Sequence, residues 1–164
     1  FLCANYDFNT IPLDGMVKPY AIKKMGPYKI GLFCIGIELA GLVPDKLYGG
    51  VKYQDPIANA NKTAQLLKDE GCNIIICLSH LGFEYKGNKV SDKVLAKSSK
   101  NIDLILGGHT HTFMSSPHRI LNQNGKEIFI NQTGWAGINL GRVDYETTSP
   151  HNAYMLGYEY SKIS

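Results

Sequence analysis

The sequence predicts an α/β fold in which a mixed β-sheet carries helices on one face. Residues 74–78 and 102–106 are short, nearly continuous apolar runs rich in isoleucine and leucine, which is typical of buried strands. A helical pattern lies ahead of each run, and three further strand-like runs follow the second one. Because helices alternate with strands early in the chain and strands follow one another later, we expect one sheet with both parallel and antiparallel neighbours.

The first two elements are expected to form a hairpin. Residues 20–25 and 28–35 have the composition of strands, and Gly26-Pro27 stands between them. Both residues of that pair favour turns, so the two strands are predicted to be antiparallel.

The first long helix is predicted to begin at Pro56. Asp55 precedes it, and its carboxylate can accept a hydrogen bond from a free N–H of the first turn, while proline suits the first helical position. Gly71 can end the helix. The residues expected to face the sheet are Ile57, Ala60, Ala64 and Leu67.

The remaining elements complete the sheet. A short helix is expected from about Ser91 to Ser99, just before the second apolar run. The later strands are predicted over residues 127–132, 138–145 and 154–160, with Asn124-Gly125 supplying a turn ahead of the first.

Three histidines follow the two apolar runs, where each run ends. Gly107-Gly108 lets the backbone turn sharply after residues 102–106, and His109 and His111 come next. His80 follows residues 74–78 in the same way. In open α/β sheets, ligands and catalytic groups lie beyond the carboxyl ends of the strands, so the three imidazoles are expected to meet there. Neutral imidazole suits zinc, manganese, iron, cobalt or nickel rather than calcium, which predicts a transition-metal site.

The motifs around these histidines resemble the second half of a calcineurin-like metallophosphoesterase domain, in the branch of the bacterial 5′-nucleotidases and UDP-sugar hydrolases. The strongest matches are Leu78-Ser79-His80-Leu81-Gly82 and Gly107-Gly108-His109-Thr110-His111-Thr112. The weaker matches are Ala4-Asn5-Tyr6-Asp7, Gly41-Leu42-Val43, Gly134-Trp135 and Gly141-Arg142. The similarity therefore covers nearly all of the chain.

The resemblance implies a metal-ligand set and a reaction. The residues matching His80 and His109 bind one ion and the residue matching His111 binds its neighbour, so two divalent transition metals such as zinc or manganese are expected in the intact protein. The reaction implied is two-metal hydrolysis of a nucleotide or another phosphoester. A compact site for a single ion, made from the same three imidazoles and water, remains an alternative.

Several motifs of that family do not occur in this sequence. The Asp-x-His motif, the Gly-Asp motif whose carboxylate bridges the metals, and the Asn-His motif that supplies the general acid are all missing. We therefore expect residues 1–164 to be a single unit, the downstream half of the domain, with no catalytic acid of its own and inactive alone. The upstream half and the C-terminal nucleotide-binding domain are expected elsewhere in the parent protein. The alternative function is a non-catalytic metal-binding or assembly module.

The same resemblance implies half of a four-layer αββα sandwich, in which one face of this sheet would pack on the sheet of the other half. Alone, the chain is expected to expose that apolar face and to cover it in a two-fold homodimer. The family is mostly exported, so a periplasmic, cell-surface or secreted location is expected, although the sequence contains no signal peptide.

Composition excludes some partners. A chain of 164 residues is long enough for one core, and its net charge of +3 is mild and unclustered, which argues against nucleic-acid binding. No apolar stretch approaches the roughly 20 residues of a membrane span. The four cysteines, Cys3, Cys34, Cys72 and Cys77, lack C-x-x-C spacing, and free buried thiols are expected, although an exported protein would favour pairing.

Other residues near the histidines allow two readings each. Trp135 could line the substrate cleft, but filling a corner of the core is favoured because tryptophan is usually largely buried. Thr110 and Thr112 could support the ligands by hydrogen bonds or could reflect β-propensity. Asn131 could orient a ligand or cap a turn. Two further histidines are expected in surface loops: His118 and His151.

Overall fold

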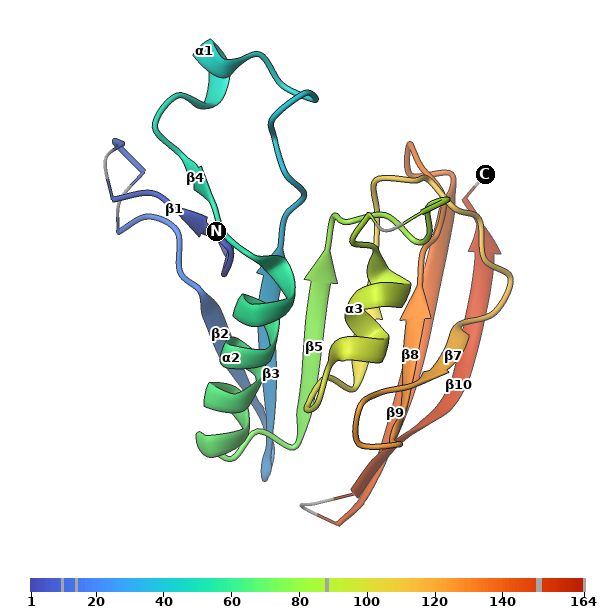
Figure 1. Cartoon of the computed structure of the whole chain (residues 1–164). Helices are drawn as coiled ribbons and strands as arrows, with labels where there is room; N and C mark the ends of the chain where they lie inside the picture. Colours follow the sequence, from blue (N-terminus) through green and yellow to red (C-terminus); the bar gives the residue numbers. More distant parts are fainter. Residues whose placement is uncertain (10, 14, 88, 150–151, 164) are drawn as a thin grey trace.

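The computed structural model describes residues 1–9, 11–13, 15–87, 89–149 and 152–163. Its centre is a six-stranded sheet with the order β2-β3-β5-β6-β8-β7 (Figure 1). The strands are β2 (Tyr20–Met25), β3 (Tyr28–Ile35), β5 (Ile74–Ser79), β6 (Leu104–Leu106), β8 (Glu127–Asn131) and β7 (His118–Leu121). The four inner strands are parallel, and the two edge strands pair antiparallel, which confirms the predicted mixed sheet.

Two helices cover the same face of this sheet (Figure 1). The longer one, α2 (Pro56–Asp69), is capped as predicted, because Asp55 Oδ1 accepts a hydrogen bond from the Ala58 N–H at 2.7 Å. The shorter one, α3 (Asp92–Ser98), begins after Ser91, whose hydroxyl accepts from the Val94 N–H at 3.3 Å. Both predicted helices are therefore confirmed, together with their capping chemistry.

The core lies between the helices and the sheet. Alternate residues of β3, β5 and β8 are buried against the helices, as the two-residue period of a strand requires, whereas the edge strands β2 and β7 contain no buried residue. In α2, three of the four predicted sheet-facing residues are fully buried and Ile57 is half-buried. The main core residues are Phe33, Ile35, Ala60, Ala64, Leu67, Ile75, Cys77, Leu95, Ile105, Ile128 and Ile130.

The opposite face of the sheet is only partly covered. Leu32 pairs with Ile76 in register, both are half-exposed, and the side chain of Leu78 on the same face is 37% exposed. A separate hairpin of β9 (Asn139–Ser149) and β10 (Asn152–Lys162) approaches the sheet near β6. There Tyr145 Oη donates to the Asp103 carbonyl at 3.2 Å. An apolar strip over β3 and β5 thus remains accessible.

Four short elements were not predicted from the sequence. They are β1 (Tyr6–Asp7), α1 (Asp45–Tyr48), β4 (Lys52–Tyr53) and β7. β1 and β4 pair only with each other over two residues, and α1 contains no buried residue. None of them carries the apolar periodicity by which a sequence indicates a helix or a strand.

Two expectations need correction, and one falls outside the described residues. His118 is not in a loop but begins β7, half-buried, with its ring edge-on to Phe83 at a centroid distance of 5.3 Å. β6 covers only residues 104–106 and is therefore shorter than the predicted run; just before it, the carboxylate of Asp103 accepts a hydrogen bond from the Ile75 N–H at 2.7 Å. His151 lies outside the described residues.

All four cysteines are free, as predicted. Cys72 and Cys77 are buried, whereas Cys3 and Cys34 are half-buried, so burial holds for only two of them. Burial raises the pKa of Cys34 to about 11, which keeps this thiol protonated and unreactive near neutral pH. Within the described part of the chain, no helix combines the length and apolar character needed to cross a bilayer.

Candidate metal centre

His80 and His109 come together where two neighbouring parallel strands end. β5 ends at Ser79 and β6 at Leu106, and the two strands pair in register. The imidazole rings lie edge to face with centroids 5.2 Å apart and planes inclined at 72°. The predicted meeting of these two rings at the carboxyl edge of the sheet is therefore observed.

The double glycine lets the histidine loop pass against its neighbours. A Cβ on Gly107 would lie 2.1 Å from Asp92 Oδ2 and 2.8 Å from Gln132 Nε2. A Cβ on Gly108 would lie 3.3 Å from His80 Nδ1. Any larger residue at the first position would push the loop away from the sheet.

The loop is held in an unusual backbone conformation. His109 and His111 have φ angles of 69° and 54°, in the left-handed region that residues with a Cβ seldom adopt. Strain of this kind costs on the order of 1–3 kcal/mol per residue and persists only where surrounding contacts enforce it. The contacts beneath the loop must supply that stabilisation.

Those contacts form a buried polar network around Gln132. Its Nε2 donates to Asp92 Oδ2 at 2.9 Å and to the Gly108 carbonyl at 3.0 Å. Its Oε1 accepts from the Thr112 N–H at 3.1 Å and from the Thr110 hydroxyl at 3.3 Å. The Gln132 amide thus acts both as a donor and as an acceptor, and its hydrogen bonds hold the loop at Gly108, Thr110 and Thr112.

Asp92 anchors the network at the start of α3. It is fully buried and accepts hydrogen bonds from the Ser79 hydroxyl and from Gln132. Burial raises the pKa of Asp92 to about 6, although these two hydrogen bonds act in the opposite direction. The residue before His80 and the loop that carries His109 are therefore tied to the same carboxyl group.

The imidazole rings of His80 and His109 are chemically suited to bind a cation. Burial, and then the neighbouring His80, lower the pKa of His109, so its ring is neutral near pH 7 and has a lone pair to offer. In the described part of the chain, no hydrogen bond engages a ring nitrogen of His80 or His109. The donor set of this pair fits a transition metal.

His111 takes a different position. Its exposed ring stacks on the indole of Trp135, with centroids 5.9 Å apart and planes inclined at 15°. Across the described residues, no three side chains of His, Cys, Asp or Glu are grouped closely enough to hold a metal by themselves. A compact three-histidine site is therefore not formed, and Trp135, at 55% exposed, does not fill the core as favoured from its residue type.

The remaining sequence expectations have mixed outcomes. Thr110 and Thr112 do make hydrogen bonds in the loop, to each other at 3.0 Å and to Gln132. Asn131 is buried, but its Oδ1 lacks a hydrogen-bond partner, so neither an orienting nor a capping contact is seen. The network role of Asp92 and Gln132 was not predicted, because the sequence marks them only as a helix start and a strand end.

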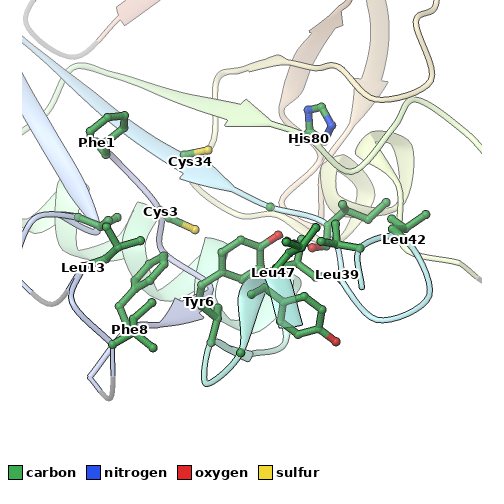
Figure 2. Close-up of a pocket in the computed structure, with 18 of the residues that line it drawn as sticks. Phe1, Cys3, Tyr6, Phe8, Leu13, Cys34, Leu39, Leu42, Leu47 and His80 are labelled. Atoms are coloured by element: carbon green, nitrogen blue, oxygen red, sulfur yellow. Dashed lines mark hydrogen bonds between the residues drawn. The ribbon is translucent and has the colours of Figure 1, made fainter. Parts of the chain in front are cut away.

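A large cavity of about 1140 Å³ opens beside the histidine pair. Figure 2 shows His80 at its edge, while apolar side chains from the N-terminal segment and from the segment after β3 form most of its wall. Its apolar wall includes Phe1, Phe8, Leu13, Leu39, Leu42 and Leu47. Leu42 and Leu47 are 51% and 69% exposed, and this cavity was not predicted from the sequence.

Known proteins match both the sequence and the fold. The family model described as calcineurin-like phosphoesterase matches residues 5–113. The trifunctional nucleotide phosphoesterase protein YfkN of Bacillus subtilis is 30% identical over 131 residues, which are 78% of this chain and 8% of that protein.

Two solved structures extend the likeness to almost the whole chain. The NAD nucleotidase of Haemophilus influenzae superposes with a TM-score of 0.80 at 26% identity, covering 99% of this chain and 34% of that one. The 5′-nucleotidase precursor of Thermus thermophilus gives a TM-score of 0.79 at 26% identity, covering 97% and 32%. The chain thus spans about a third of these solved relatives, and by its sequence and its fold it belongs to the calcineurin-like phosphoesterase family.

Proposed function

We propose that this chain is the downstream half of a metal-dependent phosphoesterase domain that hydrolyses nucleotides. In this proposal His80 and His109 bind one divalent transition metal and His111 binds its neighbour. The observation that carries it is the meeting of the His80 and His109 rings, 5.2 Å apart, at the ends of two parallel strands. The relatives named above are a nucleotide phosphoesterase, an NAD nucleotidase and a 5′-nucleotidase precursor, which supports nucleotides as the substrate class.

The metals suited to these imidazoles are zinc, manganese or a similar ion. Two such ions, when bound, polarise phosphoryl oxygens and lower the pKa of water, which is the chemistry that phosphoester hydrolysis requires. The histidines act as ligands, not as acids or bases. Gln132 and Asp92 keep the ligand loop in its strained form through the hydrogen bonds described above.

The rest of the site is proposed to come from the upstream half of the domain. Two observations support a partner on the open side of the sheet. The apolar strip with Leu78 is accessible, and the buried Oδ1 of Asn131 lacks a partner in the described structure. A buried carbonyl oxygen without a hydrogen bond is uncommon in a complete protein. In the absence of that half, a second copy of the chain is proposed to cover the strip.

The isolated chain is proposed to be inactive, because the bridging carboxylate and the general acid would lie in the upstream half. The alternative function, a non-catalytic metal-binding or assembly module, is favoured by the absence of a three-ligand group among the described residues. An exported location, periplasmic, cell-surface or secreted, is proposed on the family resemblance and agrees with the precursor form of the Thermus relative.

Activity of the full-length protein tests the proposed function. His109→Ala is expected to abolish hydrolysis of AMP, and His118→Ala, at the edge strand, is expected to leave it intact. Retention of activity in the first variant would overturn the ligand assignment. Hydrolysis of nitrophenyl phosphate or AMP by the isolated chain, lost with a chelator and with His111→Ala, would instead show that the chain is active alone.

A further inference from the structure

A pocket of about 180 Å³ opens where β1, β4 and α1 lie near the segment that follows β3 (Figure 1). Three tyrosines line it: Tyr6 from β1, Tyr48 from the end of α1 and Tyr53 from β4. Of the described residues that line this pocket, none is a proposed metal ligand. Drug-sized ligands occupy pockets of roughly 300–1,000 Å³, so this one suits only a small group.

Tyr6 and Tyr53 form two adjoining walls of the pocket. They stand directly opposite each other in the antiparallel pairing of β1 with β4, so their side chains lie on the same face of that ribbon. Their ring centroids are 6.0 Å apart, and the ring planes are inclined at 54°. A small group lying in the angle between the two rings would contact both of them.

Hydrogen bonds hold two of the three phenol rings in place. Tyr6 Oη donates to the Ile37 carbonyl, and the ring lies so close to Gly36 that a Cβ there would overlap the phenol. Tyr48 Oη donates to Asp45 Oδ1 at 2.8 Å. Because both hydroxyl groups already have partners, a group entering the pocket would meet mainly the carbon surface of these rings.

The surroundings of the tyrosines are negatively charged. Glu38 lines the pocket with an exposed carboxylate, which makes no ion pair within the described part of the chain. The pKa of Tyr53 is raised to about 12, first by burial and then by the charge of Glu38, so the phenol stays neutral. None of the described lining residues is Lys, Arg or His. Aromatic rings beside a carboxylate favour a cation.

We propose that Tyr6, Tyr48, Tyr53 and Glu38 form an aromatic cage that binds a trimethylammonium group. In such a group the charge is spread over methyl surfaces, which can contact the negative faces of the rings directly. A primary ammonium is a compact and strongly hydrated charge, so its desolvation in the pocket costs more. The trimethylammonium group is supplied by free choline or by the choline headgroup of a lipid. The cage does not depend on the proposed metal site.

A series of small ligands tests the cage in the 164-residue chain. Tetramethylammonium and choline are expected to shift the amide NMR signals of Glu38 and Tyr53 saturably. The methyl protons of choline are expected to move upfield, because they lie over aromatic rings. The uncharged analogue 3,3-dimethylbutanol and ammonium chloride are expected to have no such effect at the same concentrations. Equal binding of the uncharged analogue, or no saturable shift with tetramethylammonium, would overturn the cage.

Substitutions separate the aromatic ring from the hydroxyl. Tyr53→Ala is expected to weaken choline binding by roughly tenfold, whereas Tyr53→Phe should retain most of the affinity because the ring face remains. Glu38→Gln is expected to weaken it by roughly threefold. Tyr28→Ala is the matched control, because Tyr28 is a half-buried tyrosine at the opposite end of β3. An equal loss in Tyr53→Phe or in Tyr28→Ala would contradict the assignment.

Flotation with phosphatidylcholine vesicles distinguishes the two sources of the group. Retention on these vesicles that is lost in Tyr53→Ala would support the cage and assign it to a lipid headgroup. Choline binding without retention would support the cage and assign it to the free molecule. Retention that Tyr53→Ala leaves unchanged, together with unchanged choline binding in that variant, would show that the tyrosines are not the site.

Discussion

The rings of His80 and His109 lie edge to face, 5.2 Å apart, although 28 residues separate them in the chain. His80 follows the last residue of β5, and His109 lies in the loop after β6. The parallel pairing of β5 with β6 brings the two histidines together. The position of His109 depends on the polar network around Gln132 beneath its loop.

Replacing Gln132 by leucine is expected to lower the free energy of unfolding by about 2–4 kcal/mol. The change removes hydrogen bonds to Asp92, the Gly108 carbonyl and the Thr112 N–H, and leaves those buried groups unpaired. Urea denaturation measures the loss. Gln123→Leu, at an exposed turn residue, is the matched control and should change stability by less than about 0.5 kcal/mol. Equal effects of the two substitutions would show that the network does not stabilise the loop.

Gly107→Ala is expected to displace the histidine loop and to cost about 1–3 kcal/mol, because the added Cβ would overlap the Asp92 carboxylate. Gly49→Ala is the control, since a Cβ there would meet only the Asp45 carbonyl at an ordinary 3.5 Å. Thermal unfolding and the amide NMR shifts of residues 107–112 report both effects. An unchanged loop in the first variant would contradict the close packing described here.

The buried carboxyl of Asp92 predicts a pH dependence of stability. Its pKa rises from 3.8 to about 6 on folding, so between these values the folded protein holds a proton that the unfolded chain has released. The contribution of Asp92 is therefore fully present below about pH 4 and is lost as the pH rises through about 6. The difference in unfolding free energy between the wild type and Asp92→Asn should shrink or reverse over that range. A difference that stays constant with pH would mean that Asp92 titrates normally.

The open apolar strip predicts self-association of the isolated chain. Light scattering during gel filtration should give a mass near twice 18.2 kDa at high concentration, because the strip containing Leu78 is then covered by a second copy. Leu78→Lys is expected to give a monomer. Leu66→Lys, at a 44% exposed position of α2 on the other side of the molecule, should remain dimeric. A wild-type monomer at every concentration would refute the dimer.

Much of the fold could be predicted from local chemistry. The hairpin of β2 and β3, the Asp55 cap and the two strands that lead to the histidines each have a signal within a few residues. The edge strand β7 has no such local sequence signal, because it is half-exposed and follows Pro117 directly. Short elements that depend on distant partners, such as β1 with β4, leave no periodicity to read.

The pairing of His80 with His109 could be predicted from the sequence, but the network that supports their loop could not. Two glycines and a His-x-His pattern are visible in the sequence, whereas the bond between Gln132 and Asp92 joins residues 40 positions apart. The exposure of Trp135 was also missed, because residue type favours burial and only the strained loop around Ala136 reverses that preference. Long-range contacts and backbone strain are the features that composition does not record.

Zinc titration of the isotope-labelled chain, followed through the imidazole ¹⁵N resonances, tests whether His80 and His109 bind one metal together. The ring signals of His80 and His109 are expected to shift together with zinc, the signal of His118 is expected to stay unchanged, and His109→Ala is expected to lower the affinity. Zinc binding of undiminished affinity in that variant, or shifts at His118 with none at His80 and His109, would contradict this shared binding.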